Sequence, residues 1–414
     1  MTAKFGVMAT LVLAMAAADA SANEEAGGDA RWMTSWYAAA QPAWDNGFIL
    51  PMNLPRLLND QSLRETVRLS AGGQRMRLVF SNRYGRQPVR IGAVRAGPAD
   101  GSVPALALTF SGAGEATIAP GAVITSDPVA LAMPPLSRLT VSSYLPSPTP
   151  VASFHWGAQQ TARLAAGNVV AAARFPGDTR VEGRLFFQAV LVEAPREAHT
   201  VVVLGDSITD GNGSTQDADR RWPDMLAQRL APDGIAVANA GISGGRLLRD
   251  GMGQSALARF EQDVLAQPGV AEVIVLLGTN DIGWPGGPFA PAERAVTVDE
   301  LANGYRQLLA AAHARGVRVT AGTLPPFEGA LEGTPFAGHY SPEKERLRQQ
   351  LNRWIRGCGL FDAVVDFDAV LRDPDRPQRL RQAFDSGDHL HPGDAGYRAM
   401  AAAVDVAAIR ERLR

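Results

Sequence analysis

The chain has 414 residues, more than one domain usually holds, so its length predicts two domains that each bury a core. Forty basic and 42 acidic residues give a net charge of −2, which argues against partners such as nucleic acid or an anionic membrane surface. The single cysteine, Cys358, excludes an intrachain disulfide. We therefore expect a small neutral or weakly charged partner.

The N-terminus is typical of a secretory signal peptide. Lys4 is followed by an apolar run over residues 5–18 and by small residues up to Ala22. The run is too short to span a bilayer, and Cys358 lies too far along the chain to carry an N-terminal lipid. We expect residues 1–22 to be removed and the mature protein to be secreted or periplasmic, without a stable membrane anchor.

Residues 31–195 form the first predicted domain and show the pattern of short strands. In "ETVRLSAGGQRMRLVFSN", apolar residues alternate with polar ones on both sides of Gly72-Gly73, which predicts two strands joined by a turn. Further short apolar runs follow, separated by glycine and proline. This spacing predicts a β-rich sandwich or jelly-roll-like domain.

Residues 200–414 form the second predicted domain, in which strand-like and helix-like segments alternate. The alternation predicts a parallel sheet with helices on both faces and a ligand site at the carboxyl ends of its strands. We expect the two domains to have separate cores, so that the second keeps its chemistry alone. The predicted strands are 201–204, 235–239, 272–277, 317–321 and 363–367, and helical periodicity is clearest over 299–316 and 341–357.

The stretch "VVVLGDSITDGNGST" places Ser207 directly after the first of these strands. Glycine-rich loops after strands also cradle phosphates, but this one contains neither Gly-Lys-Ser/Thr nor Gly-x-Gly-x-x-Gly. A calcium loop starting at Asp210 also fails, because Thr215 and Arg221 stand where a glycine and a glutamate are needed. Ser207 is therefore either a turn residue or a nucleophile.

Three further loops favour the nucleophile. "DSGDHLHPGDAGY" contains Asp388 and His391, whose spacing lets a carboxylate orient an imidazole that acts as general base. Asn280 in "GTND" offers an amide donor, and a backbone N–H beside Gly244 in "NAGISGG" offers another. Together they predict nucleophilic catalysis by Ser207. No cluster with metal-ligand spacing accompanies them, so we expect no metal or organic cofactor.

The segments "GDSIT", "NAGISGG", "GTND" and "DHLHP" resemble the sequence blocks of the SGNH, or GDSL-type, hydrolases. These are esterases and acylhydrolases on a flavodoxin-like α/β/α fold. The resemblance implies a serine esterase whose triad and oxyanion hole come from these blocks, and the N-terminal signal adds the expectation that it is secreted. The implied triad is Ser207, Asp388 and His391, and the implied oxyanion donors are the N–H groups of Ser207 and Gly244 and the side chain of Asn280.

The resemblance covers residues 201–397 and departs only at Ile208, where the family name has leucine. Two longer stretches, "DADRRWPDMLAQRL" and "SALARFEQDVLAQPGV", are similar to a two-domain secreted subgroup, some of whose members are associated with xylan breakdown. This narrower resemblance implies a carbohydrate ester as substrate, with acetyl groups as the acyl part.

A rival nucleophile lies in the second block, because Gly241-Ile-Ser243-Gly-Gly245 also fits the Gly-x-Ser-x-Gly elbow of α/β-hydrolases. That elbow requires a helix immediately after the serine. The sequence after Ser243, "GGRLLRDGMGQSA", is rich in glycine and begins a helix poorly. It also leaves the Ser207 loop unexplained, so Ser207 is favoured.

Two alternative functions remain open at this point. The first is a glycan-binding protein with little or no catalysis, whose stacking surface would be formed by Trp32, Trp36, Tyr37 and Trp44; aromatic residues in such a pattern are more often packed in a core. The second is an arylesterase or lipase-type acylhydrolase acting on non-carbohydrate esters. The sequence leaves the acyl chain, the alcohol and the oligomeric state open.

Overall fold

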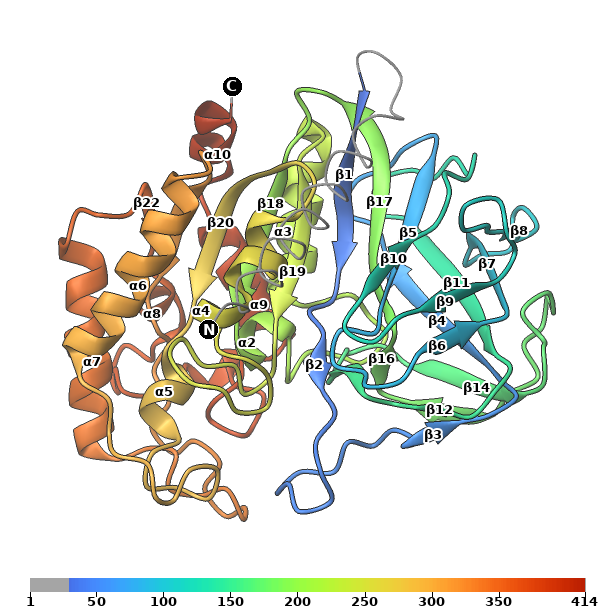
Figure 1. The fold of residues 1–414 in the computed structure, drawn as a ribbon. Helices are drawn as coiled ribbons and strands as arrows, with labels where there is room; N and C mark the ends of the chain where they lie inside the picture. The colour runs from blue at the N-terminus through green and yellow to red at the C-terminus, as the bar shows by residue number, and fades with distance from the viewer. Residues whose placement is uncertain (1–29, 414) are drawn as a thin grey trace, which may run out of the picture.

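The computed structural model describes residues 30–413, so the predicted signal peptide lies outside the described residues. A strand-rich part ends at Pro195, and a part with alternating strands and helices begins at Thr200 (Figure 1). Within residues 30–413, no helix combines the length and the apolar character that crossing a membrane requires.

The strand-rich part is built on two antiparallel sheets, one of four strands in the order β1-β17-β5-β10 and one of six in the order β15-β14-β4-β11-β7-β8. Smaller ladders join β16, β13 and β2, β12 and β3, and β6 and β9. The bounds in the large sheets are β1 (Ala30–Tyr37), β4 (Gln61–Arg68), β5 (Met76–Ser81), β7 (Ala93–Pro98), β8 (Leu106–Ala107), β10 (Val123–Thr125), β11 (Arg138–Leu145), β14 (Ala162–Ala166), β15 (Thr179–Val181) and β17 (Phe187–Pro195). Those in the ladders are β2 (Gln41–Pro42), β3 (Leu57–Leu58), β6 (Val89–Ile91), β9 (Ala116–Ile118), β12 (Thr149–Pro150), β13 (Ser153–Trp156) and β16 (Gly183–Leu185).

The strands on either side of Gly72-Gly73 exist, but the expected pairing between them is wrong. β4 pairs with β11 and β14, whereas β5 pairs with β17 and β10 in the other sheet. Gly73 instead bonds to the backbone of Met133, and a Cβ at Gly72 would lie 2.5 Å from the Met133 carbonyl oxygen. The glycines are therefore used where the chain crosses between sheets and approaches another segment closely.

The alternating part contains one five-stranded parallel sheet with strand order β19-β18-β20-β21-β22. In chain order this is 2-1-3-4-5, the order of flavodoxin-like doubly wound sheets. All five predicted strands are present. Their bounds are β18 (Thr200–Gly205), β19 (Ala236–Gly241), β20 (Val270–Leu276), β21 (Arg318–Gly322) and β22 (Ala363–Val365).

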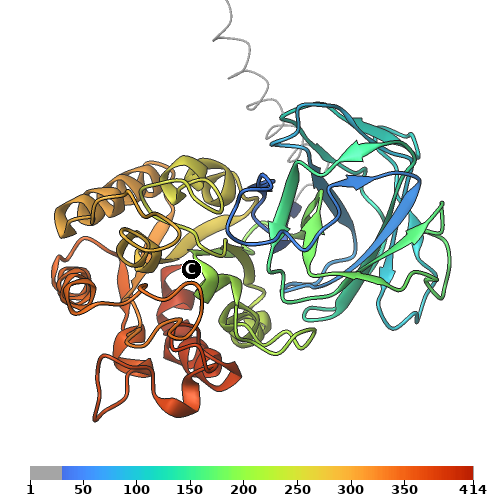
Figure 2. The ribbon, with the colours of Figure 1, turned by 90° about the horizontal axis from the view of Figure 1, so that it is seen from below.

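Helices cover both faces of this sheet, as Figure 2 shows from below, looking toward the carboxyl ends of the strands. On one face α3 packs against β19 and α9, and on the other α6 packs against α4 and β21. The long α6 starts at a capping box in which Thr297 and Glu300 exchange hydrogen bonds. The helices are α2 (Ser207–Asp210), α3 (Trp222–Leu230), α4 (Ala256–Phe260), α5 (Thr279–Gly283), α6 (Val298–His313), α7 (Pro342–Gly357), α8 (Phe367–Leu371), α9 (Asp394–Ala403) and α10 (Val406–Arg412), with a π-helical turn at Glu261–Leu265.

The two parts meet along β1 and β19, and each has its own core cluster, but a few residues of each part are buried in the cluster of the other. Tyr37 and Ala39 from the strand-rich part are buried in the cluster of the parallel sheet. Conversely, Met252 and Trp284 are buried among the side chains of the strand-rich part. The interface between the two parts along β1 and β19 is called the seam below. Because residues of each part complete the core of the other, contacts across the seam contribute to the stability of both parts.

Candidate active site

Ser207 is held at the carboxyl end of strand β18, which lies between β19 and β20 in the parallel sheet. Asp206 caps the short helix α2 by accepting a hydrogen bond from the N–H of Ile208 at 3.0 Å. A Cβ at Gly205 would lie 2.0 Å from Oγ1 of Thr209 and 3.0 Å from the carbonyl oxygen of Leu276, so only glycine fits before the turn. The tight turn leaves the Ser207 side chain at the sheet edge, only 7 % exposed.

The fold brings together Ser207, His391 and Asp388, although His391 lies 184 positions after Ser207 in the chain. Nε2 of His391 lies 2.7 Å from Oγ of Ser207, and Nδ1 of the same ring lies 2.6 Å from Oδ2 of Asp388. A ring bound by a carboxylate at Nδ1 carries its proton there, which leaves Nε2 free to accept the serine proton. This geometry is that of a nucleophile, its general base and the carboxylate that orients the base.

The environment of Asp388 keeps its carboxyl group ionised. Burial by itself would raise the pKa of Asp388, but the hydrogen bond and the charge of His391 hold it well below the ordinary value. Its Oδ1 also accepts the backbone N–H groups of Leu390 and His391, at 2.9 and 2.8 Å. The carboxylate is therefore locked in both orientation and charge beside the imidazole ring.

The proposed oxyanion donors lie at the ends of three neighbouring strands. Asn280 is buried at the start of α5, where its Nδ2 donates to the carbonyl oxygen of Gly245 at 3.1 Å; that bond uses one of the two amide protons and leaves the other. Gly244 has a φ of +69°, and a Cβ there would lie 2.3 Å from Sδ of Met252. Within the described residues, the N–H groups of Ser207 and Gly244 have no acceptor. Unused donors of this kind can hold an anion.

Ser243 does not have the surroundings of an elbow nucleophile. Its Oγ donates to Oδ2 of Asp210 at 2.7 Å, and its backbone N–H donates to the same oxygen at 3.0 Å. Within the described residues, no histidine nitrogen contacts its hydroxyl group. An elbow also needs a helix directly after the serine, whereas the next α-helix begins only at Ala256. The structure therefore gives Ser243 the contacts of an anchoring residue.

The structure also brings to the site a residue that no sequence motif marks. His155, on β13 of the strand-rich part, places Nε2 3.0 Å from Oδ1 of Asp210, and both side chains are buried. Nothing in the sequence around His155 marks it, because a lone histidine in a strand is usually a structural residue. Only the fold brings it against the segment that follows Ser207.

His389, the other histidine of the C-terminal loop, has a different partner. Its Nδ1 lies 2.5 Å from Oδ2 of Asp385, and its side chain is 45 % exposed. It therefore forms a separate pair at the rim, next to the pair formed by Asp388 and His391.

A row of stacked aromatic rings begins next to the oxyanion loop. Trp284 stacks on Phe289 with ring centroids 4.7 Å apart, and Phe289 stacks on Phe336 at 5.1 Å. Trp284 lies 2.9 Å from where a Cβ of Gly244 would be, so the row starts in contact with that loop. Phe289 and Phe336 are only partly buried, and the row runs toward the surface.

The aromatic residues proposed as a sugar-stacking surface are not available to a ligand. All four side chains are at most 7 % exposed, and Trp36 stacks on Phe187 inside the strand-rich core. This result removes the observation that motivated a glycan-binding function. The four residues are Trp32, Trp36, Tyr37 and Trp44.

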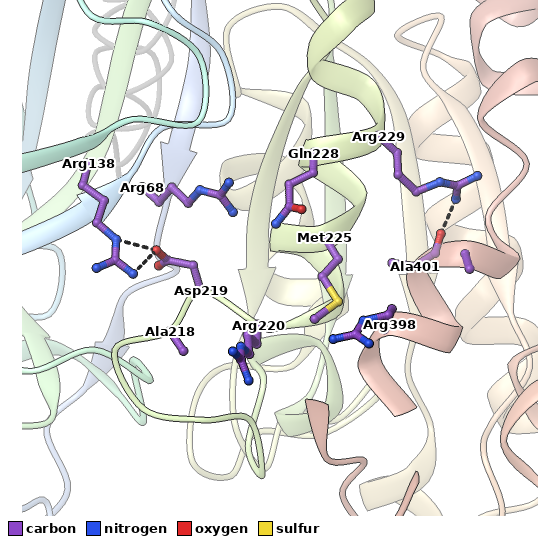
Figure 3. A pocket seen from close by; sticks show the side chains of 11 residues that line it. Arg68, Arg138, Ala218, Asp219, Arg220, Met225, Gln228, Arg229, Arg398 and Ala401 are labelled. Carbon is purple, nitrogen blue, oxygen red and sulfur yellow. Dashed lines mark hydrogen bonds and ion pairs between the residues drawn. The ribbon is translucent and has the colours of Figure 1, made fainter. Parts of the chain in front are cut away.

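An arginine-rich hollow of about 640 Å³ lies elsewhere, along the seam between the strand-rich part and helices α3 and α9 (Figure 3). Two of its arginines already serve structural contacts: Nε of Arg138 donates to Asp219 at 2.7 Å, and Arg229 donates to the carbonyl oxygens of Ala401 and Val404. None of the proposed triad residues lines it. Among the described residues, no group of three or more histidine, cysteine or acidic side chains could hold a metal ion.

Residues 203–399 match the sequence profile of the family described as GDSL-like lipase/acylhydrolase. No curated protein sequence matches the chain significantly. Solved structures with similarity to the chain include a carbohydrate acetylesterase family member from Sinorhizobium meliloti, with 19 % identity over 52 % of this chain and 99 % of that one and a TM-score of 0.41. A GDSL-like lipase from Bacteroides thetaiotaomicron has 21 % identity over 51 % and 88 % of the two chains, with a TM-score of 0.36. An acetyl xylan esterase has 18 % identity over 49 % and 96 %, with a TM-score of 0.36.

Proposed function

We propose that Ser207 is the nucleophile of this chain, a carboxylic ester hydrolase whose residues 203–399 match the profile of the GDSL-like lipase/acylhydrolase family. The observation that carries this proposal is the continuous hydrogen-bond series from Oγ of Ser207 through the His391 ring to the carboxylate of Asp388. Each of these atoms has the partner that its role requires.

In the acylation step, Nε2 of His391 takes the proton from Ser207 as Oγ attacks the ester carbonyl carbon. The carbonyl oxygen becomes an anion and accepts hydrogen bonds from the N–H groups of Ser207 and Gly244 and from Nδ2 of Asn280. As the tetrahedral intermediate collapses, His391 returns the proton to the alcohol oxygen, the ester C–O bond breaks, and an acyl-serine remains. Asp388 stabilises the imidazole while it carries the additional proton.

Deacylation repeats the sequence with water as the nucleophile. His391 removes a proton from water, the hydroxyl attacks the acyl-serine, and the same donors hold the oxyanion. The proton then passes to Oγ of Ser207, which leaves as the free serine, and the carboxylic acid departs. The sequence consumes one water and needs no external oxidant or reductant.

As substrate class we propose a carbohydrate ester with a short acyl group. The proposal rests on the similarity of the stretches around Trp222 and Phe260 to the two-domain subgroup. Esters of aryl or long-chain alcohols are the alternative, and the partly buried aromatic row at Phe289 and Phe336 is the feature that favours them. We also propose that the protein is exported, on the basis of its N-terminal 22 residues.

The nucleophile is tested with a small ester such as p-nitrophenyl acetate and with a fluorophosphonate probe. We expect Ser207→Ala to lower turnover at least about a thousandfold, because it removes the attacking oxygen. The probe should modify Ser207 in the wild-type protein, which peptide mass spectrometry reads directly. Modification of Ser243 instead, or full turnover by Ser207→Ala, would contradict the proposal.

The substrate class is tested by comparing acetylated xylooligosaccharides with p-nitrophenyl esters of two to twelve carbons. Preference for the acetylated sugar, expressed as kcat/KM, supports the carbohydrate ester. A higher kcat/KM for the longer acyl chains assigns the protein to the lipase-type alternative, without affecting the assignment of Ser207.

A further inference from the structure

We infer that His155, a residue of the strand-rich part, positions the oxyanion loop through Asp210 and Ser243 and is required for full turnover. The inference rests on the proposed function, because it assigns Gly244 to the oxyanion hole. It makes the strand-rich part a structural component of the active site instead of a separate accessory module.

The first link is the His155 ring, which is held from both sides. Nδ1 lies 2.8 Å from the carbonyl oxygen of Ala39, and Nε2 lies 3.0 Å from Oδ1 of Asp210. A carbonyl oxygen and a carboxylate oxygen both accept hydrogen bonds, so each ring nitrogen of His155 faces an acceptor. Its strand, β13, is fixed by pairing with β16 and β2.

The second link is Asp210, the last residue of the helix that begins at Ser207. It is 1 % exposed, and its two carboxylate oxygens have different partners. Oδ1 meets His155, whereas Oδ2 accepts both the backbone N–H and the hydroxyl group of Ser243. A buried carboxylate needs such partners, since leaving it unpaired is costly.

The third link is the backbone itself, because Gly244 directly follows Ser243. The peptide plane between these residues carries the Gly244 N–H, so the orientation of Ser243 sets the direction of that donor. Gly157, two residues after His155, brings the same strand-rich segment close to this anchor: a Cβ there would lie 3.4 Å from Oγ of Ser243. The strand-rich part therefore reaches the anchor of the oxyanion loop through the hydrogen bond of His155 and approaches it closely at Gly157.

Asp210 has a histidine on one side and a serine on the other, but the three residues do not form a second catalytic triad. In a triad the imidazole lies between the carboxylate and the hydroxyl group. Here the carboxylate lies between the imidazole and the hydroxyl group, so no base faces Oγ of Ser243. His155, Asp210 and Ser243 therefore hold the oxyanion loop in position and transfer no proton.

The test compares His155→Ala and His155→Gln in the full-length protein. An oxyanion donor acts mainly in the transition state, so we expect His155→Ala to lower kcat for p-nitrophenyl acetate about tenfold or more while KM changes less than about twofold. The amide of Gln keeps an N–H donor that can reach Asp210, so His155→Gln should recover most of the lost turnover.

Thr34→Val is the matched control. Oγ1 of Thr34 is buried and binds Gln267 across the same seam at 3.2 Å, near the amino ends of the parallel strands and away from Ser207. Its removal weakens the seam without touching the oxyanion loop. We expect an unchanged kcat per folded molecule, with any loss confined to the melting temperature.

Hydrogen exchange of the backbone gives a readout that does not depend on activity. In His155→Ala, the peptide that contains Ser243 and Gly244 should exchange faster, whereas that containing Asn280 should not. The inference would be overturned if His155→Ala had the kcat and the exchange rates of the wild-type protein. It would also be overturned if Thr34→Val lost as much kcat as His155→Ala. A wild-type protein without esterase activity would instead refute the proposed function, and the exchange result would still test the positioning by His155.

Discussion

Asn280 is the residue at which binding and catalysis are most easily separated. Its remaining amide proton is proposed to bind the oxygen only as that oxygen becomes an anion. We expect Asn280→Ala to lower kcat on the order of a hundredfold, about 3 kcal/mol, with little change in KM. Asn280→Asp should be worse, because its carboxylate would place negative charge against the oxyanion.

The competing explanation for Asn280 is that its bond to the Gly245 carbonyl merely shapes the loop. That role predicts a lower melting temperature with kcat per folded molecule nearly intact. Thermal melts recorded alongside kcat and KM distinguish the two, and a destabilised but fully active Asn280→Ala protein would rule out the oxyanion role.

Asp206 gives the fold a pH dependence. Burial raises its pKa to about 7, although the N–H of Ile208 acts in the opposite direction. An unfolded aspartate releases its proton at about pH 4. Between about pH 4 and pH 7, Asp206 therefore keeps a proton in the folded state that it has lost in the unfolded state. The stability that this proton provides is present below pH 4 and is lost as the pH rises through 7, at up to about 1.4 kcal/mol per pH unit.

Asp206→Asn removes this titration and leaves the turn similar in shape. The melting temperature of the variant relative to wild type should therefore increase as the pH is raised from 4 to 7. Denaturation at several pH values measures the difference. A difference that stays constant over this range would show that Asp206 is ionised throughout.

At the residue scale, the candidate site was largely predictable because its parts lie in short segments with distinctive chemistry. Ser207 follows a buried strand, and Asp388 lies three residues before His391, a spacing that lets one side chain reach the other. The structure brings these residues together as predicted, although their catalytic roles stay predictions until tested. His155 was not predictable, because its partner Asp210 is 55 residues away and nothing local marks the pair.

At the scale of elements, the C-terminal loop over residues 385–392 carries two histidine–aspartate pairs of unequal importance. His391→Ala should lower kcat at least about a thousandfold, because Oγ of Ser207 loses its base. His389→Ala should lower it less than about tenfold, since His389 pairs with Asp385 at the rim. Steady-state kinetics of the two variants decide this; equal losses would mean that the whole loop had been displaced.

The existence of elements was more predictable than their pairing. The five parallel strands appear where apolar runs predicted them, and the three strands that carry the site, β18, β19 and β20, are buried on both faces over most of their length. β4 and β5 were also located correctly, but their partners were not. Pairing in an antiparallel sheet depends on strands far apart in the chain, such as β17 for β5, and alternation alone does not identify them. The sandwich or jelly-roll interpretation of this part stays a prediction.

At the scale of the whole molecule, the seam couples the strand-rich part to the site more closely than composition indicates. Ser70 accepts the N–H of Val237 on β19 at 3.0 Å, and Tyr37 donates to Asp263 at 2.8 Å. Both bonds are buried, and His155 adds a third. Length and periodicity predict two parts, but they carry no information about contacts across a seam.

These contacts change what is expected of the fragment 196–414. The sequence predicts that it keeps its chemistry, but the structure shows that it would expose β19, Met252 and Trp284 to water and would leave Asp210 without His155. An uncovered edge strand and apolar side chains favour aggregation. We therefore expect the fragment to be poorly soluble and at least about tenfold less active on p-nitrophenyl acetate, the loss that a displaced oxyanion donor predicts.

Complementation distinguishes a missing structural partner from a chain that cannot fold. Adding a separately produced 30–195 segment during refolding should restore soluble protein and turnover, because the seam is formed by contacts and needs no covalent link. The same segment carrying His155→Ala should restore solubility but leave turnover low. A monomeric 196–414 fragment with the wild-type melting temperature and kcat would show instead that the parallel sheet and its site are complete without the strand-rich part.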